Sequence, residues 1–196
     1  MRNAETTKEH IIKESANLFN TQGYKATSLS DITKATGFTK GAIYRHFENK
    51  LDLEQQALQL LSKIMFEELA KTIRQANTFQ SKFEAIFSFF ENYMNTPLFE
   101  GGCPLLNVAV EADDSHPGLR LQANDMLIQF KEAISILFKN GIKNNQVKVT
   151  VDCDYYSTII IATLEGGIMM SKLQQDKKSL ITSIKHLRSL VNEITV

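Results

Sequence analysis

Apolar residues recur at steps of three and four along almost the whole chain, which is the spacing of amphipathic helices. The pattern from about residue 6 to residue 21 predicts a helix whose buried side carries Ile11, Ile12, Ser15, Ala16, Leu18 and Phe19. A longer unbroken pattern runs from Leu51 to about Gln75. The alternation of strand and helix patterns that a parallel sheet requires is absent. The sequence therefore predicts an all-α fold.

Helix boundaries are marked closely between residues 28 and 50. Ser28 or Ser30 can cap a short helix, and Gly37 supplies its C-terminal stop. Thr39 can cap the next short helix, and Asn49 the long one that follows it. Two short helices joined by a glycine-containing turn are the arrangement of a helix-turn-helix, whose second helix fits the major groove of DNA.

The chain between residues 140 and 152 leaves alternatives open. A turn around Gly141 is followed by Val147, Val149 and Val151, where a short strand is the alternative to a loop. We favour the loop, with Thr150 or Asp152 as the cap of the following helix.

Composition narrows the class of protein. Of the 196 residues, 43% are hydrophobic and 22% charged, as in ordinary globular proteins. No apolar run reaches the roughly 20 residues that span a bilayer, and the polar N-terminus lacks the apolar core of a signal peptide, so we expect a cytoplasmic protein without membrane contact. Cys103 and Cys153 form neither a metal-binding spacing nor a disulfide framework, and we expect no metal or cofactor.

Charge is unevenly distributed, although the formal net charge is zero. Residues 1–50 hold eight Lys/Arg against five Asp/Glu, so the predicted helix-turn-helix lies in the basic part of the chain. This small surplus agrees with nucleic-acid binding but does not establish it, because affinity for the phosphate backbone depends on clustered cations.

The stretch from about Thr6 to Leu61 resembles the N-terminal DNA-binding domain of the TetR family of bacterial transcriptional repressors. The resemblance rests on the apolar pattern around Ile12 and Phe19, the Gly23-Tyr24 turn, and the run GAIYRHFENKLDL from Gly41. It implies a homodimeric repressor that binds a palindromic operator on double-stranded DNA and releases it when a small molecule occupies the C-terminal part. The implied organisation is an N-terminal three-helix helix-turn-helix domain, residues 1–50, and a C-terminal helical bundle for dimerisation and ligand binding, residues 51–196.

Two alternatives stay open. The protein could be an architectural DNA-binding protein that responds to no ligand, or a helical-bundle enzyme with an appended DNA-binding module. The second alternative lacks any recognisable nucleophile-base or metal constellation. The carboxylates and histidine of the acidic cluster Glu111, Asp113, Asp114 and His116 lie on an expected solvated turn, where an active site is not expected.

The expected DNA contacts gather on and around the second short helix. Lys and Arg side chains can bond guanine edges or phosphates, and Tyr can reach a phosphate oxygen. Gly41 lets the backbone approach closely, and Ala42 could contact a thymine methyl group. Residues near helix ends are candidates for contacts that position the protein on the phosphate backbone. The predicted set is Thr27, Ser28, Thr39, Lys40, Gly41, Ala42, Tyr44, Arg45, His46 and Lys50, with Ile43 and Phe47 in the core.

The C-terminal part contains a phenylalanine-rich helix. Its aromatic side is either core packing or the lining of a pocket for an apolar or aromatic ligand. In the second case, the predicted lining is Phe83, Phe87, Phe90, Met126 and Phe130.

The last two expected helices are candidates for the dimer surface. Small and apolar residues permit close helix packing between chains, although the same stripes could serve the core of one chain. The candidates are Tyr155, Tyr156, Ile159, Ile160, Thr163, Gly166, Gly167 and Met170, followed by Ile181, Ile184, Leu187, Leu190 and Val191.

Overall fold

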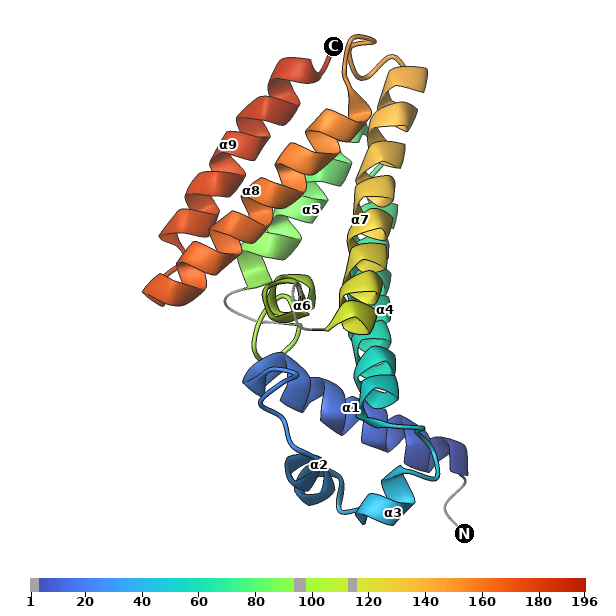
Figure 1. The fold of residues 1–196 in the computed structure, drawn as a ribbon. Coiled ribbons are helices and arrows are strands. Elements are labelled where there is room, and N and C mark those ends of the chain that lie inside the picture. Colours follow the sequence, from blue (N-terminus) through green and yellow to red (C-terminus); the bar gives the residue numbers. More distant parts are fainter. Residues whose placement is uncertain (1–3, 94–97, 113–115) are drawn as a thin grey trace. The chain divides into compact units, whose positions relative to one another are not determined.

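The computed structural model describes residues 4–93, 98–112 and 116–196, and these residues form nine α-helices and no β-strand (Figure 1). The prediction of an all-α fold is confirmed. The helices are α1 (Ala4–Gln22), α2 (Leu29–Thr36), α3 (Lys40–Ile43), α4 (Lys50–Arg74), α5 (Phe79–Tyr93), α6 (Pro104–Ala112), α7 (Pro117–Lys143), α8 (Cys153–Gln174) and α9 (Lys178–Ile194). None of the described helices combines the length and the apolar character that crossing a bilayer requires.

The chain forms two compact units, and their boundary does not fall at residue 50. The first unit takes residues 1–65 and 98–126, and the second takes 66–97 and 127–196. Helices α4 and α7 therefore contribute residues to both units. The functional division into residues 1–50 and 51–196 stays a prediction.

Apolar side chains of α1, α2 and α3 form a core within the first unit. Ile11, Phe19, Ile32, Ile43 and Phe47 are all buried, as the spacing predicts. Ala35 lies three positions after Ile32 on α2, but it is exposed. Its neighbour Thr36 is buried instead, and its hydroxyl is satisfied by a hydrogen bond that it donates to the Ile32 carbonyl at 2.7 Å.

Helix α6 is bonded to α1 within the first unit. The Asn20 side-chain amide donates to the carbonyls of Glu100 and Gly102 at 2.6 and 2.9 Å. The Asn107 amide of α6 donates to Asn20 Oδ1 and to the Asn20 carbonyl, both at 3.1 Å. This polar network joins the end of α1 to the start of α6.

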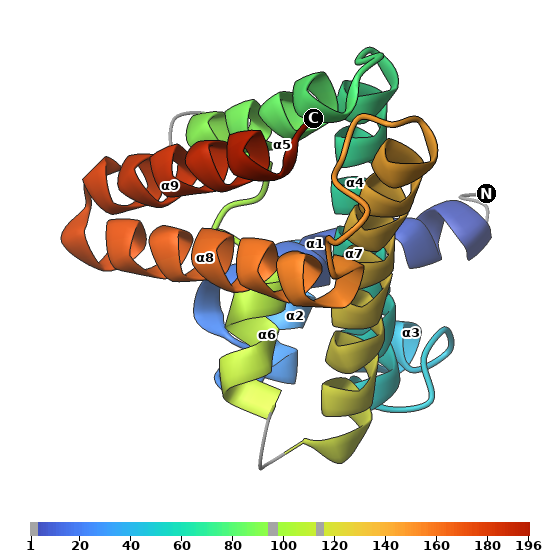
Figure 2. The same cartoon turned by 90° about the horizontal axis from the view of Figure 1, so that it is seen from above.

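Aromatic rings fill the second unit. Phe138 of α7 lies 5.4 Å from Phe79 and 5.1 Å from Phe83, measured between ring centroids. Helices α8 and α9 lie side by side in both ribbon views (Figures 1 and 2). They approach closely at Gly167, where an added Cβ would lie 2.9 Å from Ser183 Oγ. Gly167 therefore serves packing inside one chain.

The turn predicted around Gly141 is wrong, because α7 continues to Lys143, but the predicted loop after it is confirmed. Val147 forms one isolated antiparallel bridge with Thr195, and the residues from 148 to 152 have no regular structure. Asp152, rather than Thr150, caps α8, because its Oδ1 accepts from the backbone N–H groups of Asp154 and Tyr155 at 3.0 and 3.1 Å.

Candidate nucleic-acid interface

Local hydrogen bonds fix both ends of α2. Ser28 is the N-cap, and its hydroxyl accepts from the Asp31 N–H at 3.2 Å while Asp31 Oδ2 accepts from the Ser28 N–H at 2.9 Å. The hydrogen bonds from Ser28 hold the pKa of the Asp31 carboxyl below its usual range. Gly37 ends the helix in the left-handed region, with φ of 71°. These features confirm the predicted start and stop of α2.

Helix α3 is short and begins at a side-chain cap. The Thr39 hydroxyl accepts from the Ala42 N–H at 3.3 Å. The regular helix ends at Ile43, and a turn follows in which the N–H groups of Tyr44 and Phe47 donate to the carbonyls of Lys40 and Ile43. Burial of Ile43 and Phe47 anchors this segment, and half-buried Ala42 lies between the anchor and the surface.

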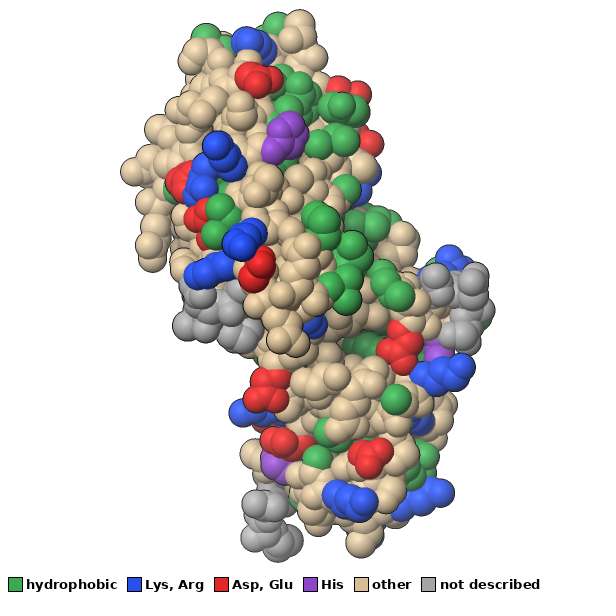
Figure 3. All heavy atoms as spheres, turned by 90° about the vertical axis from the view of Figure 1, so that its left-hand side faces the viewer, with side chains coloured by type: hydrophobic (Ala, Val, Ile, Leu, Met, Phe, Trp, Pro, Cys, Tyr) green, Lys and Arg blue, Asp and Glu red, His purple; other side chains and the backbone are tan. Residues whose placement is uncertain are grey.

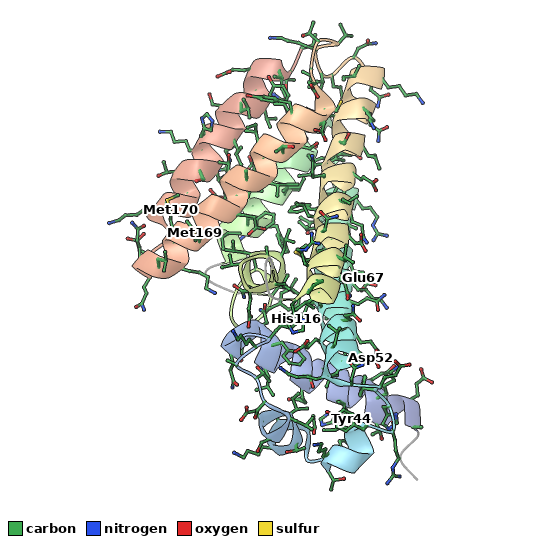
Figure 4. All side chains as sticks on the ribbon, viewed as in Figure 1. Tyr44, Asp52, Glu67, His116, Met169 and Met170 are labelled. Carbon is green, nitrogen blue, oxygen red and sulfur yellow. The ribbon has the colours of Figure 1, made fainter. Side chains whose placement is uncertain are left out.

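The polar side of α3 is exposed. Lys40, Gly41, Tyr44 and Arg45 all present surface to solvent. The Lys40 Nζ atom lies 5.9 Å from the centroid of the Tyr44 ring, a cation–π arrangement. Figure 4 labels Tyr44 beside α3. Lysine, arginine and tyrosine side chains commonly form hydrogen bonds with base edges and phosphates of DNA. Lys40, Arg45 and Tyr44 bring all three types together on one short exposed segment.

Thr27 has internal partners. Its side chain is fully buried, its hydroxyl donates to the Gly23 carbonyl at 2.6 Å, and its N–H donates to the same carbonyl at 3.1 Å. The structure therefore leaves Thr27 no exposed polar group with which to contact DNA. The sequence pattern of a threonine near the start of a helix is the same whether its hydroxyl faces solvent or forms a hydrogen bond within a turn.

Lys50 also bonds inside the first unit. Its Nζ donates to the Tyr24 carbonyl at 2.6 Å and lies 3.0 Å from Glu54 Oε1 and 5.8 Å from the centroid of the Phe19 ring. These partners differ from the phosphate that the sequence predicts. The start of α4 is otherwise as expected, because Asn49 Oδ1 accepts from the Asp52 N–H at 2.9 Å (Asp52 is labelled in Figure 4).

The remaining predicted contacts lie at helix ends. Ser28 and Thr39 are exposed caps, and His46 is half-buried with its ring centroid 6.4 Å from that of Phe47. Two further exposed cations outside the predicted set, Lys25 and Lys34, lie before α2 and in its last turn. Both lie near the end of a helix or turn, and this was also the criterion by which the sequence indicated His46.

The predicted ligand-pocket residues are all buried. Phe83, Phe87, Phe90 and Phe130 belong to the second unit, where the centroids of Phe90 and Phe130 lie 6.3 Å apart. Met126 belongs to the first unit. Phe83 and Phe87 form the floor of an open groove of about 430 Å³ between α5 and α9, whose rim includes Glu84 and Arg188.

The described residues contain no group of three His, Cys, Asp or Glu side chains that could hold a metal ion. Of the acidic cluster, Asp113 and Asp114 lie outside the described residues. Glu111 accepts two backbone hydrogen bonds in the first unit. His116 Nε2 lies 3.9 Å from Glu54 Oε2.

Comparison with known proteins covers both parts of the chain. Residues 11–57 match the family described as "Bacterial regulatory proteins, tetR family", and residues 80–187 match "Tetracyclin repressor-like, C-terminal domain".

Solved structures and curated proteins agree with these matches. A TetR transcriptional regulator from Chloroflexus aurantiacus J-10-FL is 33% identical, with all of this chain and 98% of that chain covered and a TM-score of 0.94. A TetR-family regulator from Cytophaga hutchinsonii is 30% identical, with the same coverage and a TM-score of 0.93. The transcriptional repressor DhaR of Mycobacterium sp. (strain GP1) is 22% identical over 178 residues, which are 88% of this chain and 86% of DhaR.

The capped helices α2 and α3, their exposed cations and these matches define a helix-turn-helix transcriptional regulator that binds DNA. The chain belongs to the TetR family.

Proposed function

We propose that the protein is a homodimeric repressor that binds a two-fold symmetric operator through α3. The observation that carries this proposal is the exposed group of Lys40, Tyr44 and Arg45 on a segment anchored by Ile43 and Phe47. A rigid anchor with free cations on its outer side suits both base and phosphate contacts. Ser28, Thr39, Gly41, Ala42 and His46 complete the proposed set, and Lys25 and Lys34 are added as phosphate contacts. Binding to the chromosome would place the protein in the cytoplasm.

The proposed dimer uses the outer face of α8 and α9. Tyr155, Met169, Met170 and Leu173 of α8 and Ile181 of α9 are large apolar side chains that stay exposed in the single chain. Figure 3 shows hydrophobic side chains gathered on the face that these helices form. In contrast, Ile160, Ile184, Leu187 and Val191 are buried within their own chain and are removed from the candidate surface. Exposed apolar area of this kind favours association with a second copy.

The proposed ligand is a small apolar or aromatic molecule that acts on the second unit. Support comes from the phenylalanine-rich core of α5 and from the groove whose floor is Phe83 and Phe87. Helix α4 continues without a break from the first unit into the second, so a change at one of its ends can be transmitted to the other. Ligand would favour a conformation with lower DNA affinity.

Selection from a random pool of double-stranded DNA tests the proposal. The wild-type protein should enrich a sequence with two inverted half-sites whose centres lie about 34–36 Å apart, one turn of DNA. Release of the labelled duplex by aromatic compounds would then identify the ligand class. Enrichment of no sequence, with binding that depends only on salt, would instead favour the architectural alternative.

A further inference from the structure

One residue of the α1–α2 turn is bonded to two other helices of the first unit. The Tyr24 N–H donates to Glu111 Oε2 of α6 at 2.8 Å, and the Lys25 N–H donates to Glu111 Oε1 at 2.5 Å. On its other side, the Tyr24 carbonyl accepts from Lys50 Nζ of α4 at 2.6 Å. Both charged side chains therefore act on the backbone of the same short turn.

The turn is shaped to receive the Glu111 carboxylate. Gly23 has φ of 94°, and a Cβ added there would lie 3.0 Å from Glu111 Oε2 and 3.1 Å from Oε1. Glycine thus provides both the left-handed conformation and the space. The two amides that follow the end of α1 then find one carboxylate acceptor, and hydrogen bonds to an ionised group are stronger than those between neutral groups.

The Lys50 ammonium is held from the opposite side. Glu54, whose side chain is 1% exposed, lies 3.0 Å from it, and a carboxylate so deeply buried needs a nearby cation. The Phe19 ring lies next to the same ammonium and stacks on the Tyr24 ring, with centroids 5.0 Å apart and planes inclined by 8°. The side chain of Lys50 is therefore directed into the first unit.

The turn leads directly into the helix-turn-helix. Thr27 bonds twice to the Gly23 carbonyl, through its N–H and its hydroxyl, and the next residue, Ser28, caps α2. A displacement of Tyr24 is therefore passed to the start of α2 through a few tightly bonded residues.

We propose that Glu111 and Lys50 are positioning residues for DNA binding, which hold the helix-turn-helix in its binding orientation by bonding the two sides of Tyr24. Both side chains have their bonding partners inside the first unit and act on DNA binding through the turn. The proposal rests on the DNA-binding role of α3 and adds the means by which α4 and α6 reach it. Loss of either bond loosens the turn and lowers DNA affinity. A movement of α4 or α6 that breaks the bond has the same effect.

Two other roles predict different outcomes. Glu111→Gln removes a negative charge from the unit that binds DNA, so a purely electrostatic role predicts equal or tighter binding. If Lys50 bonded a phosphate, its removal would lower the slope of log Kd against log salt concentration by about one. The positioning role predicts weaker binding in both cases and an unchanged slope.

The experiment uses the full-length protein and the fluorescein-labelled duplex that the wild type selects from a random pool. The variants are Glu111→Gln and Lys50→Met/Glu54→Gln, in which the second substitution prevents an unpaired buried carboxylate. Glu9→Gln and Lys71→Met are matched controls, because Glu9 is exposed on α1 and Lys71 is exposed on α4 with Glu68 as its partner. Anisotropy across a salt series should show about tenfold weaker binding for both variants, with the wild-type slope and unchanged controls.

Hydrogen exchange supplies a second readout at the turn itself. The amides of Tyr24 and Lys25 should exchange faster in Glu111→Gln, while amides in α8 and α9 keep their protection. Wild-type affinity of Glu111→Gln, or a salt slope reduced by about one in the Lys50 variant, would overturn the proposal. Lys40→Ala separates the two proposals, since unchanged binding there would remove the role of α3 whatever the turn variants do. If one of the two variants has lost its helical circular dichroism signal and is therefore unfolded, the DNA affinity of the other variant tests the proposal.

Discussion

The guanidinium of Arg188 on α9 donates two hydrogen bonds to the carboxylate of Glu84 on α5, from Nε at 2.9 Å and from Nη2 at 2.6 Å. The same guanidinium donates to Glu91 at 2.7 and 3.0 Å. The planar fork of arginine suits two-bond pairing with carboxylates, so one side chain joins α9 to two carboxylates that lie about two turns apart on α5. These bonds hold the pKa of the Glu84 carboxyl below its usual range and raise the pKa of Arg188.

Arg188→Ala should destabilise the protein. The side chain is one-third exposed, so solvent screens the pairing, and we expect a loss of about 1–2 kcal/mol in the free energy of unfolding. Urea denaturation followed by circular dichroism measures it. Lys185→Ala, on the exposed side of the same helix, is the control and should change little. Equal midpoints for the two variants would mean that the fork contributes nothing.

Acid should remove the contribution of Glu84. Because its pKa is lower in the folded protein than in the unfolded chain, the pairing stabilises the fold at pH above the unfolded-state pKa. The stability is lost as the pH falls through the folded-state pKa. Wild type should therefore melt above Glu84→Gln at neutral pH, and the gap should close as the carboxyl becomes protonated. A gap that is constant from pH 7 to about pH 3 would contradict this prediction.

Two glycines with positive φ should respond differently to alanine. Gly37 has φ of 71° and open space around it, so Gly37→Ala should cost only the left-handed strain, about 1 kcal/mol. Gly101 has φ of 84°, and its added Cβ would lie 2.1 Å from the Asn20 carbonyl oxygen. Backbone cannot move aside as a flexible side chain can, so Gly101→Ala should cost clearly more than Gly37→Ala. Thermal melts of the pair test this order.

Features that depend on neighbours in sequence could be predicted, and features that depend on distant partners could not. The caps at Ser28, Thr39 and Asn49 follow from bonds to residues three positions away. Lys50 instead bonds to Tyr24, and Glu111 to the turn before α2, partners that no local pattern reveals. The starts of α2 and α3 could therefore be predicted from the sequence. The bond from Lys50 to the Tyr24 carbonyl could not, and a DNA phosphate was predicted in its place.

The stripe on α9 shows a related limit. Periodicity shows which residues share a helix face, but it does not show whether that face packs inside the chain or against another copy. Ile184, Leu187 and Val191 share such a face, and they pack within their own chain.

Lys40→Ala should alter sequence preference as well as affinity. Its ammonium is exposed at the start of α3, where it can reach a base edge, so we expect a loss of about 1–3 kcal/mol for the selected duplex and relaxed discrimination at one position of each half-site. Competition among duplexes with single base changes measures it. Lys13→Ala removes an exposed cation from α1 and serves as the control. A uniform loss across all sequences would reassign Lys40 to the phosphate backbone.

Met170→Glu/Leu173→Glu should separate the proposed dimer. Both side chains are exposed on α8, Leu173 to 78%, and Figure 4 labels Met170 together with Met169 on this helix. In a two-fold interface each substitution occurs twice, so four new carboxylates would lose solvent without partners. Light scattering should give a dimer mass for wild type and a monomer mass for the variant. DNA affinity should fall with it, because two recognition helices must be held at the spacing of two half-sites. Ile136→Glu places a carboxylate at another exposed position, on α7, and should leave the mass unchanged. A monomeric wild type would contradict the proposed dimer surface.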